Sequence, residues 1–249
     1  MDRLIYTAMS GMTDSMNRQR VIASNMANAQ TVGFRADMIA STPVTLKGPA
    51  LEARAMSDGE VRSADMTPGT VSSTGNPLDI AMQGTDMMAV QATDGTEVYT
   101  RRGDLSVSPT GVLTNGDNLP VMGNGGPITV PVDAKLKIGP DGTILAVDPT
   151  NPNLQPSVVD KIKIASTDGS QIAKGLDGQF RVVGGGILPA DDNAQVSVES
   201  LEGSNVSASQ VMVDMLQAQR LFDIRTKLLS TAKDMDQSGT SLLRQSAGS

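Results

Sequence analysis

Both ends of this 249-residue chain carry apolar residues at the spacing of an α-helix, whereas the region between them does not. The first pattern predicts a helix over residues 3–29, with two series that repeat every seven positions and are offset by three. Its apolar members include Ile5, Ala8, Met12, Ile22 and Met26. Polar Ser15 and Gln19 interrupt the series, and Gly11 costs about 1 kcal/mol relative to Ala inside a helix. We therefore expect this helix to be marginal in isolation.

The second pattern predicts a longer helix over residues 207–244. Ser207 followed by Gln210 is typical of a capping box at a helix start. One apolar series runs along the helix, with Arg225 as its polar exception: Val211, Met215, Ala218, Phe222, Leu229 and Ala232. A second series consists of Leu221, Leu228, Met235 and Leu242. An apolar surface this broad can contact more than one neighbour.

Between the two helical segments the apolar residues alternate with polar ones, and Asp-Gly and Asn-Gly dipeptides separate the runs. This pattern predicts short antiparallel strands joined by turns. We expect a β domain over residues 75–203, barrel-like or sandwich-like, and an extended connector over residues 36–74. Residues 1–35 and 204–249 then supply the helices of an inner, coiled-coil-like domain, so the predicted fold class is α+β.

The composition excludes several classes of function. The chain has no Cys and no His, which removes thiol chemistry, the usual zinc ligands and the commonest general base. We therefore predict no enzyme activity, no catalytic residues, no metal site and no cofactor. The acidic region between two mildly basic ends disfavours nucleic-acid binding, and we expect the pair Arg101-Arg102 to be a solvated strand end.

No run of apolar residues is long enough to span a membrane. The N-terminus also lacks the pattern of a secretory signal, because polar residues interrupt its apolar stretch. If the protein leaves the cytosol, we expect an export route without a cleaved signal peptide.

Four segments resemble, in order, the motifs of the bacterial flagellar rod and hook family. They are NMANAQTVGFR (25–35), GNPLDIAMQGTDMMAVQ (75–91), VYTRRGDLSVSPTGVLTNGDNLPVMG (98–123) and SNVSASQVMVDMLQAQRLFDI (204–224). The terminal motif positions that we take as functional are Asn25, Ala27, Asn28, Thr31, Gly33, Phe34, Gln217, Gln219 and Arg220.

The resemblance implies a structural subunit of the rod, the axle that transmits motor torque to hook and filament. It implies export by the flagellar type III apparatus to the periplasmic basal body, where other rod subunits and further copies of the chain are the partners. A proximal-rod subunit is the preferred interpretation. The alternatives are a distal-rod or hook-related subunit, or a secreted ligand-binding β domain with oligomerising helices.

We expect the apolar series of both helices to form the assembly interface, by packing on each other and on the termini of other copies. We also expect the segment NAQTVGF to end the first helix, with Gly33 as a left-handed cap. Phe34 then either pins the outgoing chain against the helices or is an ordinary buried ring beside a cap.

Overall fold

The computed structural model describes residues 2–45, 55–131, 134–147 and 155–246, and side chains within 9–39, 63–131, 134–147, 155–235 and 237–238. It confirms a mixed helix and strand architecture with one helix near each end and a β region between them. The chain divides into two compact units. The helical unit comprises residues 1–27, 37–63 and 207–249, and the β unit comprises residues 28–36 and 64–206.

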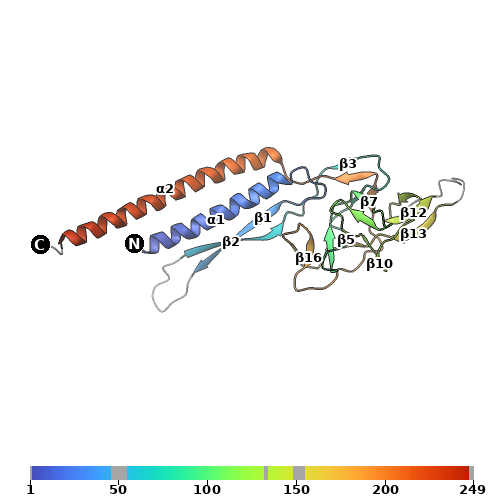
Figure 1. Cartoon of the computed structure of the whole chain (residues 1–249), viewed down its shortest axis with the longest axis horizontal. Helices are drawn as coiled ribbons and strands as arrows, with labels where there is room; N and C mark the ends of the chain where they lie inside the picture. The colour runs from blue at the N-terminus through green and yellow to red at the C-terminus, as the bar shows by residue number, and fades with distance from the viewer. Residues whose placement is uncertain (1, 46–54, 132–133, 148–154, 247–249) are drawn as a thin grey trace. The chain divides into compact units, whose positions relative to one another are not determined.

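The helical unit is built from helices α1, Asp2–Ala27, and α2, Ala208–Ser246. The two helices pack side by side along most of α1 (Figure 1). Strands β1, Asp37–Thr45, and β2, Ala55–Ala64, form a two-stranded sheet, and β1 also contacts α1. No helix in the described ranges combines the length and apolar character needed to cross a membrane.

Ser207 caps α2, as the sequence predicts. The backbone N–H of Gln210 donates to Ser207 Oγ at 3.4 Å. The other half of the capping box does not form, because the Gln210 amide instead donates to Asp214 Oδ1 one turn later, at 3.0 Å. One of the unpaired donors at the start of the helix is therefore satisfied by a side chain.

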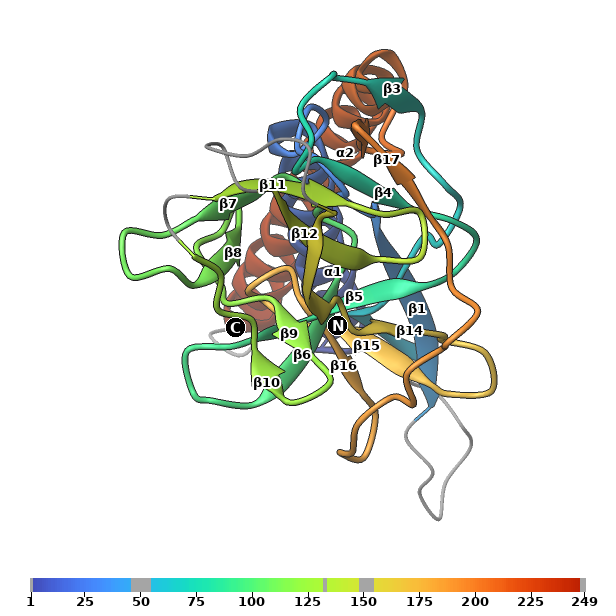
Figure 2. The same ribbon diagram turned by 90° about the vertical axis from the view of Figure 1, so that its right-hand side faces the viewer.

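The β unit consists of short antiparallel strands grouped into several small sheets (Figure 2). The largest sheet has five strands in the order β14-β5-β6-β16-β15, and β11-β12-β13 form a second sheet. Pairs β3-β18, β4-β17, β7-β8 and β9-β10 complete the set. The strands are β3 Val71–Ser73, β4 Ile80–Met82, β5 Met87–Gln91, β6 Glu97–Thr100, β7 Leu105–Val107, β8 Leu113–Asn115, β9 Met122–Gly123, β10 Gly126–Pro127, β11 Lys135–Ile138, β12 Thr143–Val147, β13 Ser157–Lys161, β14 Ile164–Ala165, β15 Ile172–Lys174, β16 Phe180–Val182, β17 Val196–Val198 and β18 Ser200–Glu202.

Strand β5 lies at the centre of the core and is buried on both faces. Met88 and Val90 belong to the larger apolar cluster, whereas Met87 and Ala89 belong to a second cluster around Tyr99. Since successive side chains of a strand point to opposite faces, this explains why the sequence of β5 is a continuous apolar run rather than an alternation.

The structure differs from the expected organisation in three places. Residues 36–74 are not only a connector, because β1, β2 and β3 lie within them. Within the region predicted to form short strands, the alternating run Ile-Thr-Val at 128–130 forms no strand and contributes a single bridge, between Thr129 and Val112. Among the described strands the sheets stay open, and they form no closed barrel. Short strands interrupted by glycine turns cannot supply the continuous ladder that closure requires.

We predict opposite outcomes for two leucine substitutions in the β unit. Leu113→Ala removes a side chain that is 0 % exposed and should lower the free energy of unfolding by about 2–5 kcal/mol. Leu176→Ala, at a residue that is fully exposed on a hairpin tip, should change it by less than about 0.5 kcal/mol. Urea denaturation followed by circular dichroism measures both, and equal losses would contradict the described core.

Candidate assembly interface

The predicted interface residues of α2 lie on the side that packs against α1. Val211 and Ala218 are buried within the single chain, at 8 % and 3 % exposure. The remaining members of the first series are half-buried: Met215, Phe222, Leu229 and Ala232 on α2, and Met12, Ile22 and Met26 on α1. The side chains of Ile5 and Ala8 lie outside the described residues. The first apolar series is therefore largely used inside one subunit.

The opposite side of α2 remains exposed although it is apolar. At 100° per residue, most of its large side chains fall on the arc that faces away from the first series, and Leu221 lies at the edge of that arc, beside α1. We call this the outer face: Met212, Val213, Leu216, Leu221, Ile224, Leu228 and Met235, each between 40 % and 61 % exposed. On α1, Met9 and Met16 are also exposed, at 54 % each. Exposed apolar side chains of this size along one helix are typical of a protein–protein contact.

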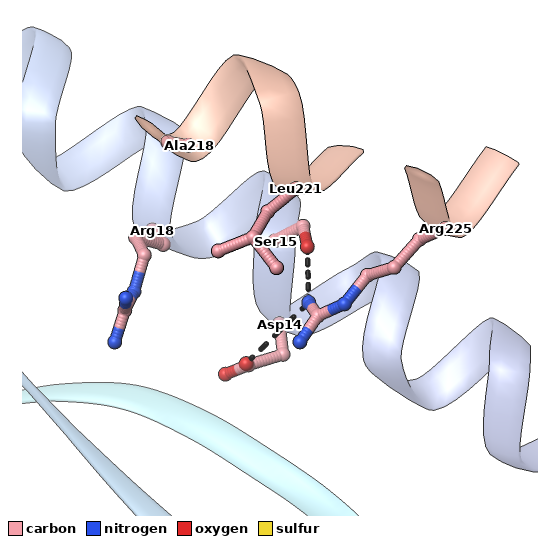
Figure 3. A pocket seen from close by; sticks show the side chains of 6 residues that line it. All are labelled: Asp14, Ser15, Arg18, Ala218, Leu221 and Arg225. Atoms are coloured by element: carbon pink, nitrogen blue, oxygen red, sulfur yellow. Dashed lines mark hydrogen bonds and ion pairs between the residues drawn. The ribbon is translucent and has the colours of Figure 1, made fainter. Parts of the chain in front are cut away.

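One polar contact interrupts the packing between the helices. The guanidinium of Arg225 on α2 donates from Nη1 to the Gly11 carbonyl and to Ser15 Oγ on α1. Asp14 Oδ2 lies 3.8 Å from the same nitrogen (Figure 3). Arg18, Ala218 and Leu221 line a small cavity beside this contact.

The chain beyond α1 belongs to the β unit. Helix α1 ends at Ala27, and two turns follow: Thr31 N–H donates to the Asn28 carbonyl at 3.1 Å, and Phe34 N–H donates to the Thr31 carbonyl at 3.3 Å. Gly33 adopts the predicted left-handed conformation, with φ of 67°, but it closes the second turn rather than capping the helix. A Cβ at this position would lie 2.4 Å from the Arg101 carbonyl, so the turn requires glycine.

A buried group of three charges joins this turn to two distant segments. Arg35 Nη2 and Arg101 Nε each donate to one oxygen of the Glu202 carboxylate, both at 2.7 Å. The side chains of Arg35 and Glu202 are 0 % exposed and that of Arg101 is 1 % exposed. Gly69 N–H donates to the same carboxylate at 2.8 Å, and the Glu202 carbonyl accepts from Gly33 N–H at 2.7 Å.

The expectation that Arg101 is solvated is therefore wrong. Besides Glu202, its guanidinium donates to the carbonyls of Met82, Gly84 and Asp86 at 2.7–2.9 Å. Burial lowers the pKa of Arg101 below its usual value, and the Glu202 carboxylate acts against this shift. Arg35 is less well satisfied, because its Nε and Nη1 have no acceptor among the described residues.

Two asparagines hold the chain segments on either side of the helices. Asn25 pairs with the backbone of Asp37, donating to its carbonyl at 3.1 Å and accepting from its N–H at 2.8 Å. Asn205 accepts from Ala36 N–H at 2.8 Å and donates to the carbonyls of Asp65 and Thr67. The side-chain amide thus substitutes for a strand partner where no strand continues.

The remaining motif residues occupy different positions. Thr31 Oγ1 donates to Asn28 Oδ1 at 3.1 Å, which stabilises the first turn. The half-buried ring of Phe34 lies 3.7 Å from Lys174 Nζ, and that ammonium donates to the Arg35 carbonyl at 2.7 Å. Phe34 therefore contacts the β unit, and its expected role as a pin against the helices stays a prediction. Ala27, Gln217, Gln219 and Arg220 are exposed.

Sequence reasoning did not single out Glu202 or Lys174. A glutamate at the end of strand β18 gives no signal of burial, because its two arginine partners are 101 and 167 residues away. Among the described residues no group of three carboxylates, or of carboxylates with other ligands, is arranged to hold a metal ion.

Three family models match the chain in order. Residues 5–35 match the model described as "Flagella basal body rod protein". Residues 81–146 match "Flagellar hook protein FlgE/F/G D1 domain", and residues 198–242 match "Flagellar basal body rod FlgEFG protein C-terminal". The first and third models cover the turn that contains Gly33 and the α2 face described above.

Curated relatives match over nearly the whole length. The flagellar basal-body rod protein FlgF of Escherichia coli is 42 % identical over 94 % of this chain and 95 % of its own length. FlgF of Salmonella typhimurium is 39 % identical over 99 % of this chain and 100 % of its own. The rod protein FlgG of Bacillus subtilis is 30 % identical over 97 % and 99 %.

Replacing the shared carboxylate tests the buried charge group. Glu202→Gln leaves two buried guanidiniums without a counter-ion and should cost about 3–5 kcal/mol of unfolding free energy. Glu199→Gln, at an exposed residue three positions earlier, is the matched control and should change stability by less than about 0.5 kcal/mol. Chemical denaturation of both variants checks this, and a Glu202→Gln variant as stable as the control would contradict it.

Proposed function

This chain belongs to the family of flagellar basal-body rod proteins, and we propose that it is a structural subunit of the proximal rod. In this role it forms part of the drive shaft that transmits motor torque for motility. Identity is higher to the two FlgF relatives than to FlgG, which favours the proximal rod over a distal-rod or hook-related subunit.

The outer face of α2 is the observation that carries this proposal. The chain has no Cys and no His, so it lacks the thiol nucleophile and the commonest general base of enzymes. It does expose seven large apolar side chains along one helix. We infer that the helices of sister subunits and of other rod proteins cover this face. Contacts between unlike faces are head-to-tail, so they allow a stack to extend rather than close.

Burial of the outer face supplies the energy for assembly. Each large apolar side chain removed from water contributes about 1.5–3 kcal/mol. The first apolar series is already used between α1 and α2, so intersubunit contacts draw on the second series, represented by Leu221, Leu228 and Met235. We propose that the helices gain most of their stability in the polymer, where they form a coiled coil, and that the β domain is itself sandwich-like.

Export follows from the same energetics. Helices that are marginal alone can pass unfolded through the flagellar type III apparatus and order on assembly in the periplasmic basal body. The alternative hypothesis, a secreted ligand-binding β domain, predicts exposed aromatic side chains at a binding site. Tyr99 and Phe180, the two aromatic residues of the region 75–203, are instead buried at 0 % and 3 % exposure.

Loss of the protein should stop rod assembly at an early stage. In a motile host whose own copy of the gene is deleted, we expect non-motile cells and basal bodies with a truncated rod, and expression of this chain should restore both. Electron microscopy of purified basal bodies locates the end of the rod. Normal rods in cells without the protein would contradict the proximal-rod assignment. A rod that ends farther from the inner membrane would favour the distal-rod alternative.

Polar substitutions on the outer face should block assembly without unfolding the subunit. Ile224→Gln with Leu228→Gln removes two exposed apolar side chains, and at about 1.5–3 kcal/mol each the subunit affinity should fall by tenfold or more. We expect loss of swimming with normal export and normal denaturation of the purified chain. Leu176→Gln, an equally polar change at the exposed hairpin tip, is the control. Full motility of the double variant would exclude the outer face as the interface.

A further inference from the structure

Three positions that weaken the helical pattern in the sequence meet at one place in the structure. Ser15 interrupts an apolar series of α1, Gly11 lowers its helix propensity, and Arg225 interrupts the apolar series of α2. Arg225 donates to the Gly11 carbonyl and to Ser15 Oγ, and Figure 3 shows the contact with Ser15. The three exceptions are therefore parts of a single contact within the helical unit.

The contact is partly enclosed by the helix pair. Ser15 is only 4 % exposed, the Arg225 side chain is 32 % exposed, and Asp14 Oδ2 lies 3.8 Å from the guanidinium. A Cβ on Gly11 would lie 3.7 Å from Arg225 Nε, which is ordinary van der Waals contact, so the Arg225 side chain packs against this turn of α1.

The heptad pattern offers Arg225 no equivalent of Ser15 in an alignment shifted by one heptad. One heptad away from Ser15 in either direction are Ala8 and Ile22, neither of which carries an acceptor in its side chain. One heptad beyond Gly11 is Arg18, which repels a second guanidinium. A slip of α2 by seven residues therefore removes the hydrogen bond between the partly buried guanidinium and Ser15, and it leaves the buried Ser15 hydroxyl without this charged donor, which is unfavourable.

We propose that Arg225 is a positioning residue that selects the register of α2 on α1. Apolar helix pairs with repeating small and medium side chains tolerate several alignments, and a single buried polar contact is the established physical means of choosing one. The register decides where Met9 and Met16 of α1 lie relative to the outer face of α2. The proposal concerns the fold of one chain and does not depend on the rod assignment.

Because the natural chain has no cysteine, pairs of introduced cysteines can report the register. Arg18 and Leu221 line the same cavity, so the pair Arg18→Cys and Leu221→Cys should cross-link when α1 and α2 have the register of the structure. Arg18→Cys combined with Asp214→Cys, or with Leu228→Cys, should cross-link only when α2 is displaced by one heptad in one direction or the other. The three double variants of the purified full-length chain are treated with a short bifunctional thiol reagent, and intrachain cross-links are quantified by mass spectrometry.

In the otherwise unchanged chain, the 18–221 pair should cross-link at least about tenfold more than either displaced pair. In an Arg225→Leu background, the displaced pairs should rise to within about threefold of it, while helical content by circular dichroism is kept. Arg225→Lys, which keeps the charge and some donors, should retain most of the preference. Lys227→Leu, which also replaces a cation by leucine but at an exposed position of α2, is the matched control and should leave it unaltered.

The outcomes decide the proposal. Exclusive 18–221 cross-linking in the Arg225→Leu background would overturn it, because apolar packing alone would then set the register. Loss of all three cross-links would also overturn it, since Arg225 would hold the helices together rather than select their alignment. Absence of the 18–221 cross-link in the unchanged chain would show that the contact itself does not form.

Discussion

A single buried carboxylate organises the β unit and the chain segments that connect it to the helices. Glu202 binds Arg35 from the segment after α1 and Arg101 from the core, while its backbone carbonyl holds Gly33. Neither arginine is exposed enough to be satisfied by water, so each member of the group depends on the others. This is why the tight turn at Gly33 and the buried glutamate occur together: the turn brings Arg35 to the carboxylate, and Arg101 prevents a larger residue at position 33.

In the helical unit, the two faces of α2 have different environments. The first apolar series of α2 packs on α1 within the chain, whereas the outer face, centred on Leu216, Ile224 and Leu228, remains exposed. Within one subunit the first series defines the helix pair, and the proposed contact between subunits requires the outer face to remain free for it.

Polar residues at apolar positions have a common explanation in both units. Arg225 in the helix pair and Arg101 in the β core each reach backbone carbonyls as well as a side-chain oxygen. A guanidinium has five donors in a fixed planar arrangement, so when it is buried it can join several chain segments at once. In the β core, where the Arg101 side chain is 1 % exposed, a different alignment would leave these donors unpaired, whereas the Arg225 side chain keeps 32 % of its surface exposed.

Much of this architecture follows from the sequence alone. Heptad spacing fixed both helices to within two residues of their ends, and the Ser207 cap, the short strands of the middle region and the left-handed Gly33 follow from local chemistry. Only the tertiary structure decided that Arg101 is buried, that residues 28–36 join the β unit, and which α2 face stays exposed. Local spacing determines what an element is, but burial depends on partners such as Glu202 that are a hundred or more residues away, and no periodicity records them.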